Sequence, residues 1–227
     1  MKRVHVLCEG QTEELFVNEL LSPLLLAKHT LVLPSLIGKP GHKGGNIKFD
    51  RLFPDLRNRL LGDRTAYCTT FFDFYGLASL FPGKQSAGRL TTVDQKSRCV
   101  CNAMVSELRH RLGDEPMQRF VPYVQMFEFE GLLFSEPTAF ASALNRPDLL
   151  SQLVEIRNSF PTPEDINDSP LTAPSKRIQS LFSGYEKPLH GCLVALETGM
   201  ENFRKQCQLF SRWIEMLESI STQINSI

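Results

Sequence analysis

Short apolar runs alternate with helical stripes along the first 135 residues. Runs rich in Val, Leu, Thr and Phe predict strands over 2–8, 30–37, 66–72 and 119–129. Between them, apolar residues recur at helical spacing and predict helices that begin at Glu13 and extend over 46–61 and 92–112. This alternation is typical of a small parallel sheet with helices on both faces, so we expect an α/β fold.

Local signals refine the first helix. Thr12 follows a Gly-Gln turn and predicts an N-cap, because its hydroxyl can accept a hydrogen bond from the first turn. Pro23 predicts a kink or an end to that helix, because proline has no backbone N–H.

The texture of the sequence changes after residue 136. Prolines punctuate a loop-rich stretch at Pro161, Pro163, Pro170 and Pro174. Short helices are expected to begin at Ser175, Leu189 and Met200. We therefore divide the chain into an α/β core, 1–135, and a mostly helical C-terminal cap, 136–227. In the cap, an apolar stripe predicts core positions at Phe210, Trp213, Ile214 and Leu217.

Composition excludes several classes of protein. Hydrophobic residues make up 42% of the 227 and charged residues 22%, which is typical of a globular chain. Lys plus Arg and Asp plus Glu both number 25, so bulk charge does not make this a polybasic nucleic-acid binder. No apolar run reaches about 18 residues and no signal peptide is apparent, so we expect no membrane span and a cytoplasmic location. The six cysteines are then expected to be reduced thiols.

Acidic residues follow the predicted strands. Glu9, Asp73 and the pair Glu128 and Glu130 stand at strand ends, and Glu13 lies four residues after Glu9. In an open parallel sheet, ligands bind outside the carboxyl ends of the strands, so these carboxylates should converge. Their mutual repulsion requires a cation, and hard oxygen ligands suit Mg²⁺ or Mn²⁺. The pattern predicts a metal site made of Glu9, Glu13, Asp73, Glu128 and Glu130.

Each acid also has a simpler interpretation. Glu13 in the first turn of a helix is favoured by the helix dipole alone, by about 0.3–1 kcal/mol. Glu9 and Asp73 also suit surface turns. Glu128 and Glu130 share a strand face by the period of two and could line a solvated edge.

Two basic segments are candidates for phosphate contacts. The loop 38–45 lacks the Gly-Lys-Ser/Thr ending of a phosphate-binding P-loop, but Lys39, His42 and Lys43 could touch a nucleic-acid backbone. Lys176 and Arg177 stand at a predicted helix start, where anions are favoured. Solvated basic segments explain both equally well.

Several strings resemble a known fold. VHVLCEGQTEELF, with Glu9 and Glu13, resembles the opening of the TOPRIM fold of topoisomerases, primases and the overcoming-lysogenization-defect (OLD) nucleases. FFDFYGL, VPYVQMFEFEGLLF, PSKRI and WIEML resemble a bacterial family of TOPRIM-like proteins of unknown function. Genes of that family often lie beside ABC- or SMC-type ATPases, in what look like defence or mobile-element loci. The resemblance covers most of the chain.

The chain departs from these patterns at two positions. Tyr75 replaces the second acid of the Asp-x-Asp motif, so Glu128 or Glu130 would have to supply the missing ligand. Phe127 stands where the close family carries a histidine.

The resemblance and the acids together predict a Mg²⁺- or Mn²⁺-dependent endonuclease that acts on nucleic acid, and the resemblance implies DNA. Glu9, Asp73 and Glu130 would bind the metal directly, and Glu13 and Glu128 would bind it or support its ligands. Lys176 would stabilise charge on the phosphoryl oxygens. One alternative is a non-catalytic partner subunit of an ABC- or SMC-type ATPase that senses nucleic acid or nucleotide. Another is a hydrolase or transferase that acts on phosphate esters of small molecules. The sequence leaves a homo-oligomer open.

Overall fold

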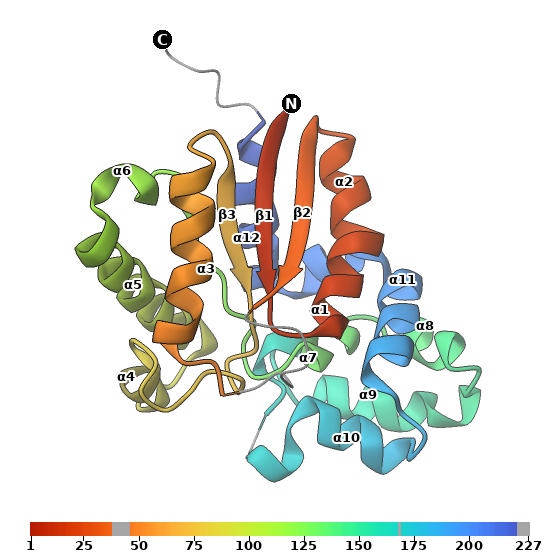
Figure 1. Cartoon of the computed structure of the whole chain (residues 1–227). Helices are drawn as coiled ribbons and strands as arrows, with labels where there is room; N and C mark the ends of the chain where they lie inside the picture. Colours follow the sequence, from red (N-terminus) through yellow and green to blue (C-terminus); the bar gives the residue numbers. More distant parts are fainter. Residues whose placement is uncertain (38–45, 168, 222–227) are drawn as a thin grey trace.

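The strands form one parallel sheet. The computed structural model describes residues 1–37, 46–167 and 169–221, and within them the sheet has four strands in the order β2-β1-β3-β4. These are β1 (Lys2–Cys8), β2 (Thr30–Leu36), β3 (Tyr67–Phe71) and β4 (Phe120–Val121). The amino ends of β1, β2 and β3 lie at the top of Figure 1 and their carboxyl ends at the bottom. The predicted α/β fold with a small parallel sheet is confirmed.

Both faces of the sheet are buried. Val4, Val6 and Cys8 of β1 join one hydrophobic cluster, and Leu7 joins the other. Successive side chains of a strand point to opposite faces, so a strand buried on both sides is apolar along its whole length. In β1 this holds for the carboxyl half, where Val6, Leu7 and Cys8 are consecutive buried apolar residues, while Lys2, Arg3 and His5 are half-buried.

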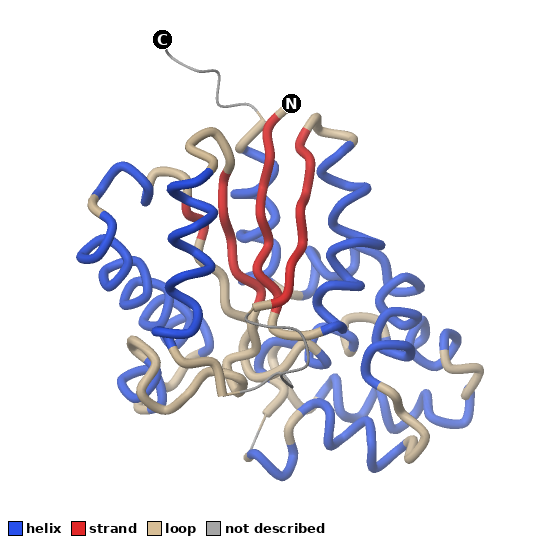
Figure 2. Tube along the Cα trace, viewed as in Figure 1, coloured by secondary structure: helices blue, strands red, loops and turns tan. Residues whose placement is uncertain are grey.

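Helices cover the two faces (Figure 2). One cluster includes α1 (Gln11–Phe16), a π-helical turn (Val17–Leu21), α2 (Ser22–Leu26), α11 (Lys187–Gln206) and α12 (Gln208–Ser219). The other includes α3 (Phe49–Gly62) and α5 (Val93–Leu112). Shorter helices complete the chain: α4 (Lys84–Gly88), α6 (Asp114–Met117), α7 (Glu130–Leu133), α8 (Pro137–Ala143), α9 (Leu150–Asn158) and α10 (Pro174–Leu181), with 3-10 turns at Pro147–Leu149, Pro163–Asp165 and Pro170–Thr172.

The predicted helical stripes are confirmed for α3 and α5. Their stripe residues Leu52, Leu56, Leu60, Val100, Met104 and Leu108 are fully buried. Helix α5 begins with a capping box, in which the Thr92 hydroxyl accepts from the Gln95 N–H at 3.2 Å.

The predicted start of the first helix is wrong. Gly10, not Thr12, is the N-cap, and Thr12 lies buried inside the helix. The Glu13 carboxylate accepts the Gly10 N–H at 2.9 Å and so satisfies a free donor of the helix start. Pro23 does not end the helix: the π-helical turn directly before it lets the chain remain helical through Leu26.

The predicted strand over 119–129 is also wrong beyond Val121. Pro122 has no N–H for the sheet, so the regular ladder stops there. The chain then pairs irregularly with the segment after β3, where Gln125 bridges Asp73 and exchanges backbone hydrogen bonds with Phe72 and Phe74. Phe127 accepts the Tyr75 N–H at 3.0 Å and adopts a left-handed backbone with φ 58°. Helix α7 begins at Glu130, so Glu128 and Glu130 do not share a strand face.

The C-terminal helices complete the core on the sheet. Trp213 is fully buried, stacks on Tyr123 with 4.4 Å between ring centroids, and donates its indole N–H to the Thr69 hydroxyl at 2.8 Å. The predicted core role of the Trp213 stripe is confirmed. The helices expected from Leu189 and Met200 are one element, α11, kinked at Gly199 (φ 76°), and α12 follows after Cys207. The division at residue 135 stays a prediction.

No helix in the described residues is long and apolar enough to cross a membrane. The cysteines carry no disulfide, and Cys8, Cys68 and Cys207 are buried.

Candidate functional site at the carboxyl edge of the sheet

The carboxyl ends of β1 and β3 bring Glu9 and Asp73 together. The Asp73 N–H donates to Glu9 Oε2 at 3.0 Å. Gly76 closes the turn after β3 and lies directly against the Glu9 carboxylate: a Cβ at Gly76 would stand 2.2 Å from Glu9 Oε2. Only glycine therefore leaves room for the Glu9 carboxylate in this position.

Glu13 joins them from the first turn of α1. Its side chain is 5% exposed. Burial first, and then the negative charge of Glu9, raise the pKa of Glu13 to about 7. Its carboxylate is therefore costly to ionise without a nearby cation.

Asp73 lies at the centre of the acidic group. It is 9% exposed, and its Oδ1 accepts the Phe129 N–H at 2.7 Å. Burial, followed by the charges of Glu13, Glu9 and Glu130, raises the pKa of Asp73 well above its usual range. Lys187 opposes this rise. Glu9, Glu13, Asp73 and Glu130 thus share one electrostatic environment, as the sequence predicted, and we call them the acidic cluster.

Glu130 is the most buried carboxylate of the cluster, at 1% exposed. The Lys187 Nζ lies 2.9 Å from Glu130 Oε1, but within the described chain neither oxygen has a well-aligned hydrogen bond. Burial raises the pKa of Glu130 even though Lys187 opposes it. Burial also disfavours the charge of Lys187, but Glu130 and Asp73 outweigh it and raise the pKa of the lysine.

Sequence reasoning missed Lys187. It occupies the first position of α11, where a cation is disfavoured by the positive end of the helix dipole. A lysine in that place, just before Pro188, was a signal that something other than the helix holds it.

Glu128 differs from the acidic cluster because it accepts a hydrogen bond from the start of another helix. Its Oε2 accepts the Ser175 N–H at 2.8 Å, at the start of α10. The helix start expected to bind an external anion thus binds a carboxylate of the same chain. Glu128 still acts on Glu130, whose pKa it helps to raise.

The structure does not bring the predicted basic residues to the acids. Lys176 is exposed, and its Nζ donates to Gln179 of the same helix at 3.2 Å. Arg177 donates to the Thr172 carbonyl at 2.8 Å and lies over the Phe160 ring. Lys39, His42 and Lys43 lie outside the described residues.

The two departures from the family pattern pack on each other. Tyr75 and Phe127 have ring centroids 5.6 Å apart. The Tyr75 hydroxyl donates to Asn167 Oδ1 at 2.8 Å, which ties the segment before α10 to the turn after β3. Where the resembled motif has a carboxylate, Tyr75 therefore stabilises this part of the chain through ring packing and a hydrogen bond.

Two further residues that the sequence did not single out border the cluster. Lys84 Nζ lies 3.3 Å from the centroid of the Phe74 ring and bonds to the Phe74 carbonyl. Burial lowers the pKa of Lys84 to about 8, although Glu9 opposes this. The Tyr185 hydroxyl is buried and has no hydrogen-bond partner in the described part of the chain. Burial, and then Glu130 and Glu128, raise its pKa.

The donor chemistry of the cluster suits a hard divalent cation. Carboxylate oxygens are the ligands that Mg²⁺ and Mn²⁺ prefer, and the buried Glu130 oxygens lack well-aligned donors. In the arrangement described here, however, no three Asp, Glu, His or Cys side chains of the described residues already face a common metal position. The carboxylates of Glu9, Glu13 and Asp73 accept backbone N–H groups instead.

Comparison with known proteins gives a family and a distant structural match. Residues 8–218 match the family model described as "Domain of unknown function (DUF4276)". A solved structure of the C-terminal region of the Xanthomonas campestris pv. campestris OLD protein is 15% identical, with a TM-score of 0.47. That match covers 98% of this chain and 97% of the other. A comparison with curated proteins finds no significant match.

Proposed function

The chain belongs to the DUF4276 family, whose description states no function, and we propose that it is a Mg²⁺- or Mn²⁺-dependent phosphodiesterase acting on nucleic acid. An endonuclease that cuts DNA is the specific form of this proposal. The resemblance of the Glu9–Glu13 segment to the TOPRIM fold supports the choice of substrate.

One observation carries the proposal: carboxylates from separate segments are buried together at the ligand-binding edge of a parallel sheet. Glu13 and Glu130 are 5% and 1% exposed, and Lys187 is the cation that pairs with Glu130. Burying like charges is costly unless a cation offsets them. Lys187 and the neighbouring Lys84 leave the four carboxylates of the cluster short of positive charge when all of them are ionised.

Glu9, Asp73 and Glu130 would hold the metal, and Glu13 would support it. When bound, the metal would lower the pKa of a water and polarise the phosphate. To bind it, the carboxylates of Glu9 and Asp73 would have to rotate away from the backbone N–H groups whose hydrogen bonds they now accept. Lys187, which lies at Glu130, would stabilise charge on a phosphate in place of Lys176.

Calorimetric Mn²⁺ titration paired with plasmid nicking in the same buffer tests this proposal. We expect the wild type to bind Mn²⁺ and to nick DNA. Glu9→Gln and Asp73→Asn should each weaken binding and nicking by at least about 100-fold, since losing even a residue that only supports a ligand typically costs about 10–100-fold.

Glu19→Gln is the matched control, because Glu19 is an exposed acid of the π-helical turn after α1 and lies outside the cluster. Its binding and nicking should equal those of the wild type. Nicking that survives in both Glu9→Gln and Asp73→Asn would contradict the proposal.

A second candidate function rests on a different observation. Glu9, Glu13 and Asp73 already accept backbone N–H groups, and Tyr75 bonds to Asn167 where a second acid is expected. Carboxylates that are held by backbone hydrogen bonds suit a non-catalytic subunit that docks on an ABC- or SMC-type ATPase. Absence of Mn²⁺ binding together with unimpaired folding would favour this subunit over the nuclease.

A further inference from the structure

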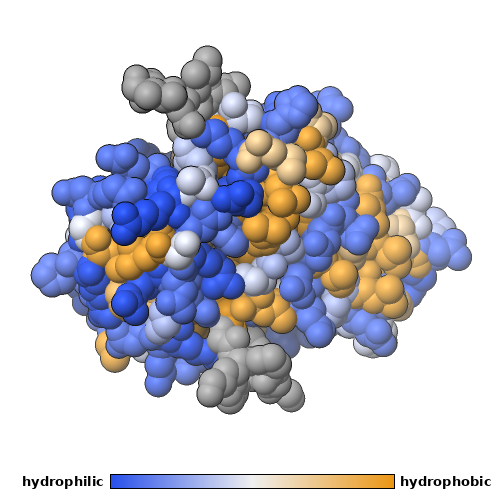
Figure 3. Space-filling model, turned by 45° about the horizontal axis from the view of Figure 1, so that its top comes forward, coloured by the Kyte–Doolittle hydropathy of each residue, from blue (hydrophilic) through white to orange (hydrophobic). Residues whose placement is uncertain are grey.

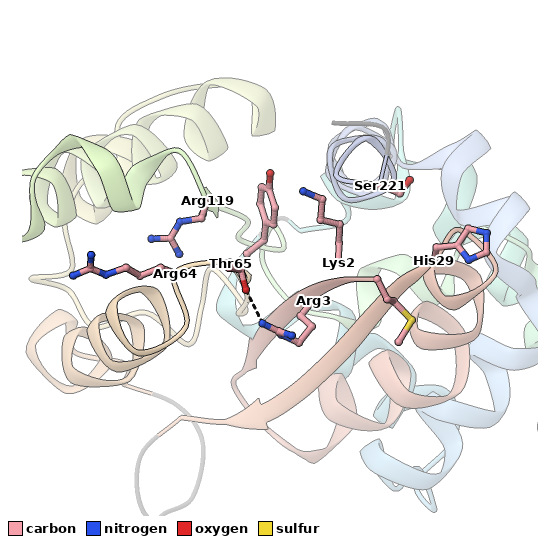
Figure 4. Close-up of a pocket in the computed structure, with 9 residues that line it drawn as sticks. Lys2, Arg3, His29, Arg64, Thr65, Arg119 and Ser221 are labelled. Atoms are coloured by element: carbon pink, nitrogen blue, oxygen red, sulfur yellow. Dashed lines mark hydrogen bonds between the residues drawn. The ribbon is translucent and has the colours of Figure 1, made fainter. Parts of the chain in front are cut away.

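A basic pocket lies at the opposite end of the sheet, where the strands begin. It is lined by Lys2 and Arg3 of β1, His29 before β2, Arg64, Thr65 and Tyr67 around the start of β3, Arg119 before β4, and Ser221 after α12, with Met1 at its rim. The seven residues of β1 separate it from the acidic cluster by about 20 Å. Figure 4 shows the cationic side chains gathered around these strand starts.

Positive charge predominates in the lining of the pocket, although Asp63 pairs with Arg3 and Glu115 with Arg119. Lys2, Arg3, Arg64 and Arg119 line it together with His29, and none of the lining residues that the structure describes carries a carboxylate. The chain as a whole has a net charge of zero, so this pocket is a local concentration of positive charge. A concave site lined by one sign of charge concentrates the field and attracts ions of the other sign.

Neighbouring groups fix two of the guanidinium groups. Arg119 donates to the carbonyls of Asp63, Ala66 and Leu60, while its buried Nε has no hydrogen-bond partner within the described chain. Arg3 is held by Asp63 at 2.8 Å and by the Thr65 hydroxyl at 2.6 Å. Guanidinium groups that are already oriented lose little entropy when an anion binds.

Arg64 differs from them. It is exposed, and among the described residues it makes no ion pair or hydrogen bond. Its charge is therefore available to a ligand without breaking an existing interaction.

The volume of the pocket and its aromatic rings restrict the class of ligand that it can bind. Its volume is about 530 Å³, within the range of small-molecule sites. Tyr67 and His29 add rings that a base could stack on. The surface at this end of the molecule is largely hydrophilic, with separate apolar patches (Figure 3). Phosphate plus an aromatic ring is the chemistry of a nucleotide.

We infer that the pocket at the amino edge of the sheet binds a nucleotide phosphate, with Arg64 and Lys2 on the phosphate, the hydrogen-bonded Arg3 and Arg119 adding positive charge, and Tyr67 beside the base. The ligand is either a free nucleotide or the phosphorylated end of a nucleic-acid strand. The inference does not rest on the function proposed for the acidic cluster.

Fluorescence anisotropy tests it with a labelled single-stranded oligonucleotide that carries or lacks a 5′-phosphate, and with AMP and inorganic phosphate as competitors. The wild type should bind the phosphorylated form more tightly. Arg64→Ala should weaken that binding about tenfold, the usual size of one lost charged hydrogen bond. Displacement by AMP indicates a free nucleotide, whereas resistance to AMP with a preference for the 5′-phosphate indicates a strand end.

Arg57→Ala is the matched control, because Arg57 is an exposed arginine of α3 that does not line the pocket. It should bind as the wild type does. Glu9→Gln separates the two sites: it should keep anion binding even if it loses Mn²⁺ binding. Three outcomes would overturn the inference: no binding of any probe by the wild type, unchanged binding by Arg64→Ala, or loss of binding in Glu9→Gln.

Discussion

The two ends of the sheet carry opposite charges in different environments. At the carboxyl edge, Glu13, Asp73 and Glu130 are 5%, 9% and 1% exposed. At the amino edge, Lys2 and Arg3 are half-buried and Arg64 is exposed. Parallel strands place all their starts at one edge and all their ends at the other, so charge placed at strand termini is separated by the fold itself. A net charge of zero conceals both sites.

The two edges differ mainly in the free energy that is needed to place charged groups there. Water screens exposed cations, whereas buried carboxylates lose their hydration and repel each other. The acidic edge should therefore dominate how stability responds to mutation and pH, and the basic edge should respond mainly to ligands.

Removing the cation of the acidic edge should have the largest effect. Lys187→Met leaves Glu130 buried without its partner. Breaking a buried pair typically costs about 3–5 kcal/mol, and because the Lys187 side chain is 41% exposed we expect about 3 kcal/mol. The loss should be greatest at neutral pH and shrink in acid, as Glu130 becomes protonated. Urea unfolding at pH 7 and pH 5 measures both.

Lys28→Met is the control for this variant. Lys28 is 46% exposed and pairs with Glu218 at 3.1 Å, but Glu218 is 13% exposed and also pairs with Arg204. We expect a loss of no more than about 1 kcal/mol. Equal losses in the two variants would show that burial of the acid does not set the cost, against our interpretation.

The pH dependence of stability should depend on Glu13. Its pKa of about 7 in the folded protein lies above the ordinary value of 4.5. Between these pH values the folded state binds more protons than the unfolded state, so stability falls as pH rises from about 4.5 through about 7. Glu13→Gln keeps an acceptor for Gly10 and removes the titration. It should gain on the order of 2 kcal/mol relative to the wild type at pH 8 and little at pH 4.5.

Glu164 contributes to the same pH window. Burial raises its pKa to about 7, although the hydrogen bonds that it accepts from the Leu209 and Phe210 N–H groups oppose this rise. The difference between Glu13→Gln and the wild type is thus the quantity to measure by chemical denaturation across pH. Parallel curves for the two proteins would exclude Glu13 as a source of the slope.

Much of the fold could be predicted from the hydrophobic pattern, because the buried positions of β1 and β3 are filled by apolar residues and threonines that favour strands. The pattern failed after β4. Pro122 stops the ladder while the residues remain apolar, so hydrophobicity alone continued the strand. The missing backbone N–H of Pro122 thus ended the regular strand, although the pattern of the residues that follow favours a strand.

The acidic cluster could be predicted in part. The acids that directly follow strands, Glu9 and Asp73, do meet, because parallel strands fix their ends together. Lys187 could not be found from spacing, because it reaches Glu130 from 57 positions along the chain. The basic pocket was missed for the same reason: its cations come from the separate starts of β1, β3 and β4.

Removing either of two tyrosine hydroxyl groups near the acidic edge should change the stability moderately, and in different directions. Tyr75→Phe removes the hydrogen bond to Asn167 and should cost about 1 kcal/mol. Tyr185→Phe removes a buried hydroxyl without a partner among the described residues, so it should be neutral or slightly stabilising. If Tyr185→Phe instead weakens Mn²⁺ binding, its hydroxyl serves the ligand rather than the fold. Thermal unfolding with and without Mn²⁺ distinguishes these results.

The smallest change in stability is expected at the basic edge. Arg64 is exposed and makes no ion pair or hydrogen bond with any described residue, so Arg64→Ala should alter the free energy of unfolding by no more than about 0.5 kcal/mol. Removing one cation from a positive pocket also relieves repulsion among those that remain, so a slight gain at low salt is consistent with the contrast. Urea unfolding at 20 mM and 500 mM NaCl measures this. A loss above about 1 kcal/mol would mean that Arg64 supports the fold, and that both edges of the sheet are structural.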